Sequence, residues 1–337
     1  MTGFEDWRLD DQATLAEADA RLRAVATAGA RLRQEWDLAA STIADLADEP
    51  RPRAVIAVGP EARLLRALLE PVCPVPFVAW PSLGLPGWVG PLDLVVVLGG
   101  SDQHAGAGLH EALRRGSRIL VVASPDSRLA RESAAHSTTL LPKTRTADPV
   151  PGAVTALAAL HTMGLGPAVD PAAVADAMDA VAAECGHLRD IAENPAKMMA
   201  IELADAQPLV WGGSILAARV SRRLAEAIRE ASGRVALAAD ASALEPLIAE
   251  TPRRDPFADP VESDPGTRPA LVLIDDGMGD AAAEEQHDRL RRVAAAHDVR
   301  TSMIQETTGD ELTRYAMLLS RGLFAAAYLR IGLERLN

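Results

Sequence analysis

The chain has 337 residues, which is long for a single layered core and favours two domains. Its formal net charge of −13 argues against a surface that neutralises nucleic-acid phosphates over a wide area, so no nucleic-acid partner is expected. The acidic start MTGFEDWRLDD lacks the apolar core of a secretion signal, and no apolar run approaches the length of a membrane span. With two distant cysteines, these features predict a soluble cytoplasmic protein that does not associate with membranes.

The first half of the chain alternates short aliphatic runs with helical patterns. Residues 10–48 carry apolar side chains at helical spacing and predict an N-terminal helical segment over 1–50. Buried strands are then expected at 53–58, 74–80, 94–98, 119–123 and 138–141. Strands separated by helices predict a parallel, doubly wound sheet, and the prolines of the second run place that strand at the sheet edge.

The second half repeats this alternation after a helical connection. We expect a first α/β domain over 51–165, a helical connector over 166–206, and a second α/β domain over 207–337 that ends in a helix. Its strands are predicted at 208–211, 234–238, 269–274 and 299–305. The predicted fold class is therefore α/β, with two doubly wound, mainly parallel sheets flanked by helices.

Two segments share one design, an apolar run followed by Gly-Gly-Ser and an amphipathic helix pattern. They are LDLVVVLGGSDQHAGAGLHEAL (92–113) and QPLVWGGSILAARVSRRLAEAI (207–228). Backbone amides at such a turn can hold an anion, because the helix dipole and unpaired donors converge there. Candidate ligand-binding residues are Gly99, Gly100, Ser101, Gln103, Gly212, Gly213 and Ser214. The alternative interpretation is that these glycines serve only the backbone path of the turn and that Ser or Asp caps the following helix.

The order of these elements resembles that of the sugar isomerase (SIS) domain. More narrowly, the chain is similar to the bifunctional phosphoglucose/phosphomannose isomerases, which carry two SIS domains. The resemblance rests on VPFVAW, LGLPGWVGPLDLVVVLGGS, Asn194-Pro195-Ala196-Lys197, Trp211-Gly212-Gly213 and Tyr328-Leu329. It implies a homodimer that binds a sugar phosphate without a cofactor. Ser124 and Ser127 fall where the family places further phosphate contacts, although a helix cap explains them equally well.

Several family positions carry other residues here. The first glycine-rich turn is reduced to Gly59-Pro60-Glu61, and the arginine expected near Pro149 is missing, with Arg145 or Lys143 as a substitute or as a solvated charge. The family's glutamate base and histidine fall on Ala243 and Pro246. Isomerisation needs a general base, so the displaced carboxylates of Glu245 and Asp240 become the candidates.

The remaining polar motifs predict no metal site. The histidines form no pair at metal-ligand spacing, and Asp275-Asp276-Gly277 is interpreted as a helix cap in preference to a Mg²⁺ site. His104 lies beside the Gly99-Gly100-Ser101 turn and is the histidine most worth replacing. The sequence thus predicts a sugar-phosphate-binding protein with a degenerate active site, related to glucose-6-phosphate/mannose-6-phosphate isomerases. The alternative is a catalytically inactive sensor or partner protein.

Overall fold

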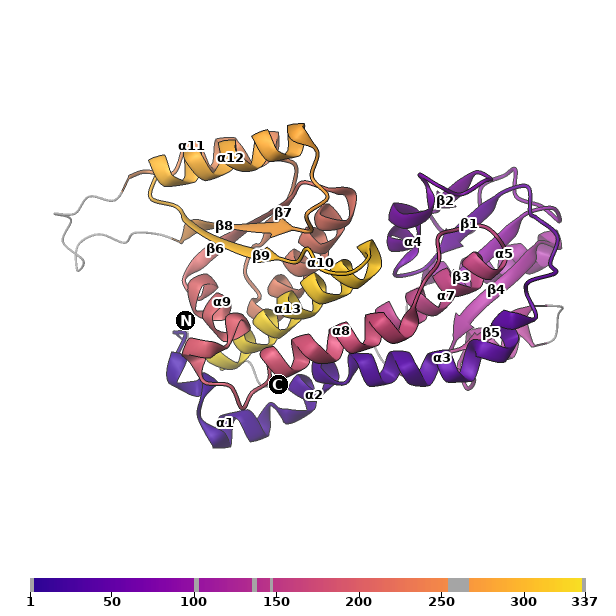
Figure 1. Cartoon of the computed structure of the whole chain (residues 1–337), viewed down its shortest axis with the longest axis horizontal. Coiled ribbons are helices and arrows are strands. Elements are labelled where there is room, and N and C mark those ends of the chain that lie inside the picture. Colours follow the sequence, from indigo (N-terminus) through magenta and orange to yellow (C-terminus); the bar gives the residue numbers. More distant parts are fainter. Residues whose placement is uncertain (1–2, 100–102, 135–137, 146–147, 254–266, 335–337) are drawn as a thin grey trace. The chain divides into compact units, whose positions relative to one another are not determined.

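The computed structural model describes residues 3–99, 103–134, 138–145, 148–253 and 267–334. The chain divides into two compact units, one formed by 28–176 and the other by 1–27 together with 177–337. Each unit contains a parallel sheet flanked by helices (Figure 1). The α/β fold class predicted from the sequence is confirmed.

Within the described residues, the 28–176 unit has a five-stranded parallel sheet in the order β2-β1-β3-β4-β5. The prolines before β2 predicted its edge position correctly. The strands are β1 (Val55–Val58), β2 (Phe77–Ala79), β3 (Leu94–Leu98), β4 (Arg118–Ala123) and β5 (Thr139–Pro142). Each predicted strand is found, because continuous aliphatic runs are what a sheet covered on both faces requires.

Helices cover both faces of this first sheet, since successive strand residues point to opposite sides. Alternate residues such as Val121 pack in one cluster with Leu109 of α5. On the other face, Gly152 of α7 lies against the neighbouring Val122. The helices of this unit are α3 (Ala28–Ala44), α4 (Ala62–Leu69), α5 (Gln103–Arg115), α6 (Arg128–Ser133) and α7 (Val150–Thr162), followed by the start of α8 (Pro171–Glu184). Helix α3 contacts both α7 and β5.

The second unit has, within its described residues, a four-stranded parallel sheet in the order β7-β6-β8-β9. Helices α11 and α12 cover one face, and α9, α10 and α13 lie on the other (Figure 1). The strands are β6 (Ala206–Gly212), β7 (Leu237–Ala238), β8 (Arg268–Asp275) and β9 (Arg300–Gln305). The helices are α9 (Pro195–Leu203), α10 (Ile215–Ser232), α11 (Ala241–Ala249), α12 (Ala281–Ala296) and α13 (Glu311–Gly332).

The N-terminal segment expected over 1–50 is divided between the two units. It forms a 3-10 turn, η1 (Asp6–Leu9), and two short helices, α1 (Gln12–Glu17) and α2 (Asp19–Ala26), before α3 begins. The first 27 residues belong with the second sheet, and their contacts include η1 and α2 against α13. Helical spacing alone does not show this division, because it arises from packing between segments far apart in sequence.

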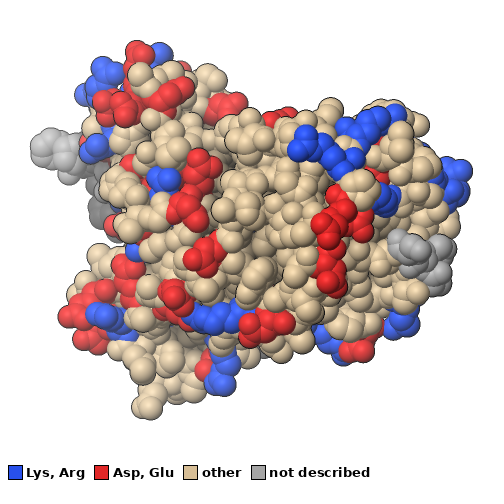
Figure 2. All heavy atoms as spheres, turned by 45° about the vertical axis from the view of Figure 1, so that its right-hand side comes forward, with Lys and Arg blue, Asp and Glu red and all other residues tan. Residues whose placement is uncertain are grey.

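No helix in the described ranges is long and apolar enough to cross a membrane. On the face shown in Figure 2, basic side chains form small groups bordered by acidic ones. That face therefore presents no broad basic surface.

Candidate functional site

Three neighbouring strands of the first sheet end at the same edge with residues suited to anion binding. Gly99 follows β3, Ser124 follows β4 and Lys143 follows β5. The strands are in register there, since the Gly99 amide donates to the Val122 carbonyl at 2.6 Å and the Lys143 amide donates to the Ala123 carbonyl at 3.1 Å. The carboxyl edge of a parallel sheet is where ligands bind in open α/β folds.

Gly99 is required by the space around it. A Cβ atom at this position would lie 2.5 Å from the Val122 carbonyl oxygen, which is closer than carbon and oxygen can approach. Gln103, at the start of α5, is exposed. The other two members of the predicted loop, Gly100 and Ser101, lie outside the described residues.

The serines after β4 have different roles. Ser127 is the N-cap of α6, and its hydroxyl accepts a hydrogen bond from the Ala130 amide at 3.1 Å. The Ser127 amide donates to the Ser124 carbonyl at 2.8 Å, which closes the turn between them. The helix-cap interpretation is therefore observed for Ser127, while Ser124 is half-buried at the sheet edge.

Lys143 is a buried cation at this edge, with only 8% of its surface exposed. Its ammonium donates to the Gly99 carbonyl at a long 3.5 Å. The nearby Arg145 is exposed and pairs with Asp126 at 2.7 Å. Of the two cations that the sequence offered as substitutes for the family's arginine, Lys143 is thus the one beside the glycine turn.

Glu35 of α3 lies against the same segment and was not identified from the sequence. It is fully buried, and its Oε1 accepts hydrogen bonds from the Thr144 amide at 2.9 Å and the Thr144 hydroxyl at 2.5 Å. Burial raises the pKa of Glu35, against the lowering effect of Thr144 and Lys143. In sequence Glu35 is one charge in a polar helix, and only the packing of α3 on β5 and α7 shows its burial.

Gly59, in the reduced first turn, serves the backbone path. Its φ of +106° and the 2.1 Å that would separate an added Cβ from the Leu98 carbonyl oxygen both demand glycine.

We expect Gly59→Ala to lower the free energy of unfolding by about 1–3 kcal/mol or more, the usual cost of a strained backbone position. Urea unfolding followed by circular dichroism measures this, with Gly106→Ala as the control, because nothing lies within 4 Å of a Cβ there. Equal stability of the two variants would contradict it.

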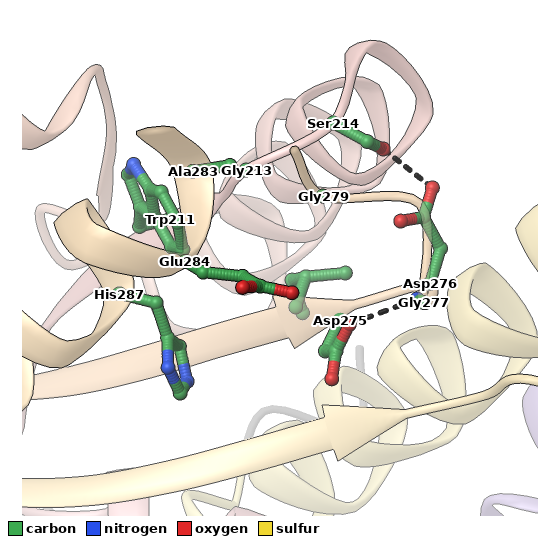
Figure 3. Close-up of a pocket in the computed structure, with 11 residues that line it drawn as sticks. Trp211, Gly213, Ser214, Asp275, Asp276, Gly277, Gly279, Ala283, Glu284 and His287 are labelled. Atoms are coloured by element: carbon green, nitrogen blue, oxygen red, sulfur yellow. Dashed lines mark hydrogen bonds between the residues drawn. The ribbon is translucent and has the colours of Figure 1, made fainter. Parts of the chain in front are cut away.

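The second glycine turn borders a pocket of about 170 Å³ at the carboxyl ends of β6 and β8 (Figure 3). Ser214 caps α10 by accepting from the Ala217 amide at 2.9 Å, and its hydroxyl donates to the Asp276 carboxylate. Asp276 is only 3% exposed and also accepts from the Met278 amide at 3.1 Å. The serine hydroxyl is therefore already bound to an acidic group.

Three carboxylates line this pocket. Asp275 and Glu284 line it along with Asp276, and no Lys or Arg is among the described residues that line it. A phosphate dianion placed here would be repelled, which argues against the predicted anion site at Gly212, Gly213 and Ser214. Sequence spacing did not show this, because Ser214 and Asp276 meet only through the pairing of β6 with β8.

Asp275 and Asp276, at the carboxyl end of β8, do not form the expected cap of the next helix. Asp275 accepts from the Gly277 amide at 2.8 Å and from the Gln305 amide group at 2.6 Å. Asp280 caps α12 instead, through the Ala283 amide at 2.8 Å. Among the described residues, no group of three or more His, Cys, Asp or Glu side chains is arranged to hold a metal ion.

Two ring side chains complete the pocket, and the sequence analysis proposed neither as a site residue. Trp211 and His287 have ring centroids 6.1 Å apart, and His287 Nε2 is buried without a hydrogen-bond partner among the described residues. Glu284 and His287 are three residues apart on α12, so one helix face presents both to the pocket (Figure 3). That spacing was the signal available in the sequence.

The candidate bases lie outside this pocket. Asp240 is the exposed N-cap residue of α11, just beyond the carboxyl end of β7. Glu245 pairs with Arg289 of α12 through two contacts of 2.8 Å. Neither is among the pocket's lining residues, and the carboxylate of Glu245 is already engaged by a guanidinium.

Comparison with known proteins bears on the fold at the level of sequence and of structure. Residues 192–333 match the family model described as the bacterial phospho-glucose isomerase C-terminal SIS domain. No curated protein matches the chain in sequence.

Three solved structures are similar to most of the chain. A glucose-6-phosphate isomerase like protein from Thermus thermophilus has 18% identity and a TM-score of 0.54, covering 89% of this chain and 91% of that one. The tagatose-6-phosphate ketose/aldose isomerase from Escherichia coli has 13% identity and a TM-score of 0.63, with 96% and 93% covered. The C-terminal domain of glucosamine-fructose-6-phosphate aminotransferase from Francisella tularensis has 14% identity and a TM-score of 0.58, with 95% of this chain and 95% of that one covered. At such identities these likenesses show the fold alone.

The two parallel α/β units, with glycine turns at their carboxyl edges, have the fold of these solved structures. More particularly, the segment 192–333 matches the SIS domain that forms the C-terminal part of bacterial phosphoglucose isomerases. The family resemblance stated from the sequence is confirmed at this level.

Proposed function

We propose that the chain binds a sugar phosphate and holds the phosphate in the 28–176 unit, at the carboxyl ends of β3, β4 and β5. The buried Lys143 ammonium beside Gly99 carries this proposal. A buried ammonium is costly unless it is paired or well hydrogen-bonded, and its 3.5 Å contact with the Gly99 carbonyl is weak. A bound anion at this edge would satisfy it.

The binding set combines the sequence hypothesis with this lysine. Gly99, Gly100, Ser101, Gln103, Ser124 and Ser127 stay the proposed sugar-phosphate contacts, and Lys143 joins them as the cation. We place no phosphate at the second turn, because the carboxylates of Asp275, Asp276 and Glu284 line it. The proposed homodimer and cytoplasmic location rest on the family resemblance and the sequence features above.

For the reaction, we propose aldose-ketose isomerisation between glucose 6-phosphate or mannose 6-phosphate and fructose 6-phosphate. A general base must move a proton between C1 and C2 of the open-chain sugar. Asp240 suits this role better than Glu245, since it is exposed at a carboxyl strand end and Glu245 is paired with Arg289. Lys143 would hold the phosphate end and take no part in the proton transfer.

A catalytically inactive sugar-phosphate sensor is the second candidate, and the ion pair of Glu245 favours it. Both carboxylate oxygens of Glu245 are in contact with the Arg289 guanidinium, so this side chain is not free to reach a substrate. If Asp240 also takes no proton, the fold keeps a ligand site without the base that isomerisation needs.

We expect hexose 6-phosphates, and not the free hexoses, to raise the melting temperature, and Lys143→Met to abolish this shift. A coupled assay with glucose 6-phosphate, mannose 6-phosphate and fructose 6-phosphate measures turnover in parallel. Asp240→Ala is compared with Glu250→Gln, which alters an exposed carboxylate at the end of the same helix.

The outcomes separate the candidates. Turnover lost in Asp240→Ala and kept in Glu250→Gln supports the isomerase. Stabilisation without turnover supports the sensor. The absence of both stabilisation and turnover, or an undiminished shift in Lys143→Met, overturns the proposed phosphate site.

A further inference from the structure

The pocket beside the second glycine turn lies where the strand order of its sheet changes direction. Strand β6 is followed by α10 and strand β8 by α12, and these two helices cover opposite faces of the sheet (Figure 1). The chain therefore leaves these two neighbouring strands toward opposite faces. A crevice at such a point is where open α/β sheets bind their ligands. The pocket of about 170 Å³ occupies this position.

An aromatic ring and closely packed backbone form part of the pocket wall. The ring of Trp211 lines the pocket at the end of β6, with its centroid 6.1 Å from that of the His287 ring (Figure 3). A Cβ atom on Gly213 would lie 2.8 Å from Trp211 Cη2 and 2.9 Å from Ala283 Cβ, so the turn packs directly on the ring and on α12. Since a cavity of about 150 Å³ holds benzene, this pocket admits a ligand with one ring and a small substituent.

Two polar groups of α12 line the pocket without partners. His287 Nε2 is buried and has no hydrogen-bond partner among the described residues. The carboxylate of Glu284, one helical turn earlier, is exposed and forms no ion pair with any described residue. Asp275 and Asp276, in contrast, are held by hydrogen bonds to backbone amides and to neighbouring side chains. Glu284 is therefore the carboxylate that is available to a ligand.

The charges around the pocket favour a cationic ligand. Three carboxylates line it, and no Lys or Arg is among the described residues that line it. The guanidinium of Arg314 donates to the Asp276 carbonyl at 2.6 Å, but Arg314 is not a lining residue. Carboxylates and a tryptophan ring both attract a cation. Because no three His, Cys, Asp or Glu side chains in the described ranges are placed to hold a metal ion, the cation that fits is an organic one.

We propose that this pocket binds a small organic ammonium, whose charged group contacts Glu284 and whose body lies against the rings of Trp211 and His287. The Nε2 of His287 is left for a second polar group of the ligand. This inference goes beyond the proposed function and is independent of it, since the proposed phosphate site belongs to the 28–176 unit.

Benzylammonium is the probe, and benzyl alcohol and benzoate are companions of similar size with neutral and negative groups. The indole N–H signal of Trp211, one of five tryptophans, is followed in the NMR spectrum of the isotope-labelled full chain. We expect benzylammonium to shift this signal with an affinity about tenfold above that of benzyl alcohol, the worth of one charge-assisted hydrogen bond. Benzoate should leave the signal unchanged, because the carboxylates repel it.

Two neighbouring glutamates of α12 provide a matched pair of variants. Glu284→Gln keeps the shape of the side chain and removes its charge, so it should weaken benzylammonium binding about tenfold and leave benzyl alcohol binding unchanged. Glu285→Gln makes the same change at an exposed residue that does not line the pocket, and it should bind both probes as wild type does. This control separates contact with Glu284 from the net charge of the chain.

The proposal is overturned by any of four results. They are no shift of the Trp211 signal with benzylammonium, equal affinity for benzylammonium and benzyl alcohol, a shift of that signal by benzoate, and equal losses in Glu284→Gln and Glu285→Gln. Tighter binding of glucose than of benzylammonium overturns it too, because the pocket would then select hydroxyl groups over a positive charge. None of these results bears on the proposed phosphate site, which Lys143→Met tests separately.

Discussion

Replacing Lys197 by methionine is expected to lower the free energy of unfolding by about 1–3 kcal/mol, the usual cost of leaving buried hydrogen-bond acceptors without their donor. Lys197 is completely buried at the start of α9. Its ammonium donates to Asp10 Oδ1 at 2.5 Å and to the His187 and Arg189 carbonyls at 3.1 and 2.7 Å, and it lies 5.5 Å from the centre of the Tyr328 ring. All of its donors are used, so we interpret this lysine as structural.

The contact with Asp10 ties residues 1–27 to the rest of their unit, 177–337. Urea unfolding followed by circular dichroism measures the loss in Lys197→Met, and limited proteolysis should release the N-terminal segment first. The control is Arg300→Met, which breaks an ion pair between exposed side chains with Asp205 and should cost no more than about 1 kcal/mol. A loss in Lys197→Met no larger than in Arg300→Met would show that the buried network contributes little.

The secondary structure follows closely from local pattern, and its assembly does not. The aliphatic run before Gly99 predicts β3 to the residue, because a strand buried on both faces has no alternative composition. The helical spacing over 10–48 predicts helix with one break at Gly29, whereas the chain turns at Asp11 and Thr27. Asp11 caps α1 through the Thr14 amide, a local signal that hydrophobic spacing hides.

The candidate site was only partly accessible from the sequence, for the same reason. Gly99 and Ser124 stand directly after predicted strands, so topology alone brings them to one edge. Glu35 reaches that edge because α3 packs on β5 and α7, a contact across more than a hundred residues that no local pattern encodes. The Ser214 to Asp276 hydrogen bond likewise depends on the pairing of β6 with β8. In sequence the Ser214 turn resembles a phosphate loop, but in the fold it borders a pocket lined by carboxylates.

Glu35 and Lys143 are the two buried charges beside the proposed anion site, and replacing both, in Glu35→Gln with Lys143→Met, is expected to leave the protein as stable as wild type or more stable by about 1–4 kcal/mol. Each group is desolvated in the folded state, and the Oε2 of Glu35 gains no hydrogen bond in return. The double variant should nevertheless lose sulfate binding. A gain in stability at the expense of binding would mark the pair as functional, since residues kept for the fold alone cost stability when removed.

The raised pKa of Glu35 determines how the stability difference between wild type and the double variant changes with pH. Burial raises the pKa of Glu35 above its value in the unfolded chain, so its contribution to stability is fully present below the unfolded pKa of about 4.3 and is lost as the pH rises through the folded pKa. The melting temperature of the double variant should therefore gain on wild type as the pH rises from about 4 towards neutrality. The control combines Glu132→Gln with Arg128→Met and so removes a surface ion pair. Its free energy of unfolding should differ from that of wild type by no more than about 1 kcal/mol at any pH. A double variant that is clearly less stable than wild type at neutral pH would instead make Glu35 and Lys143 part of the structural core.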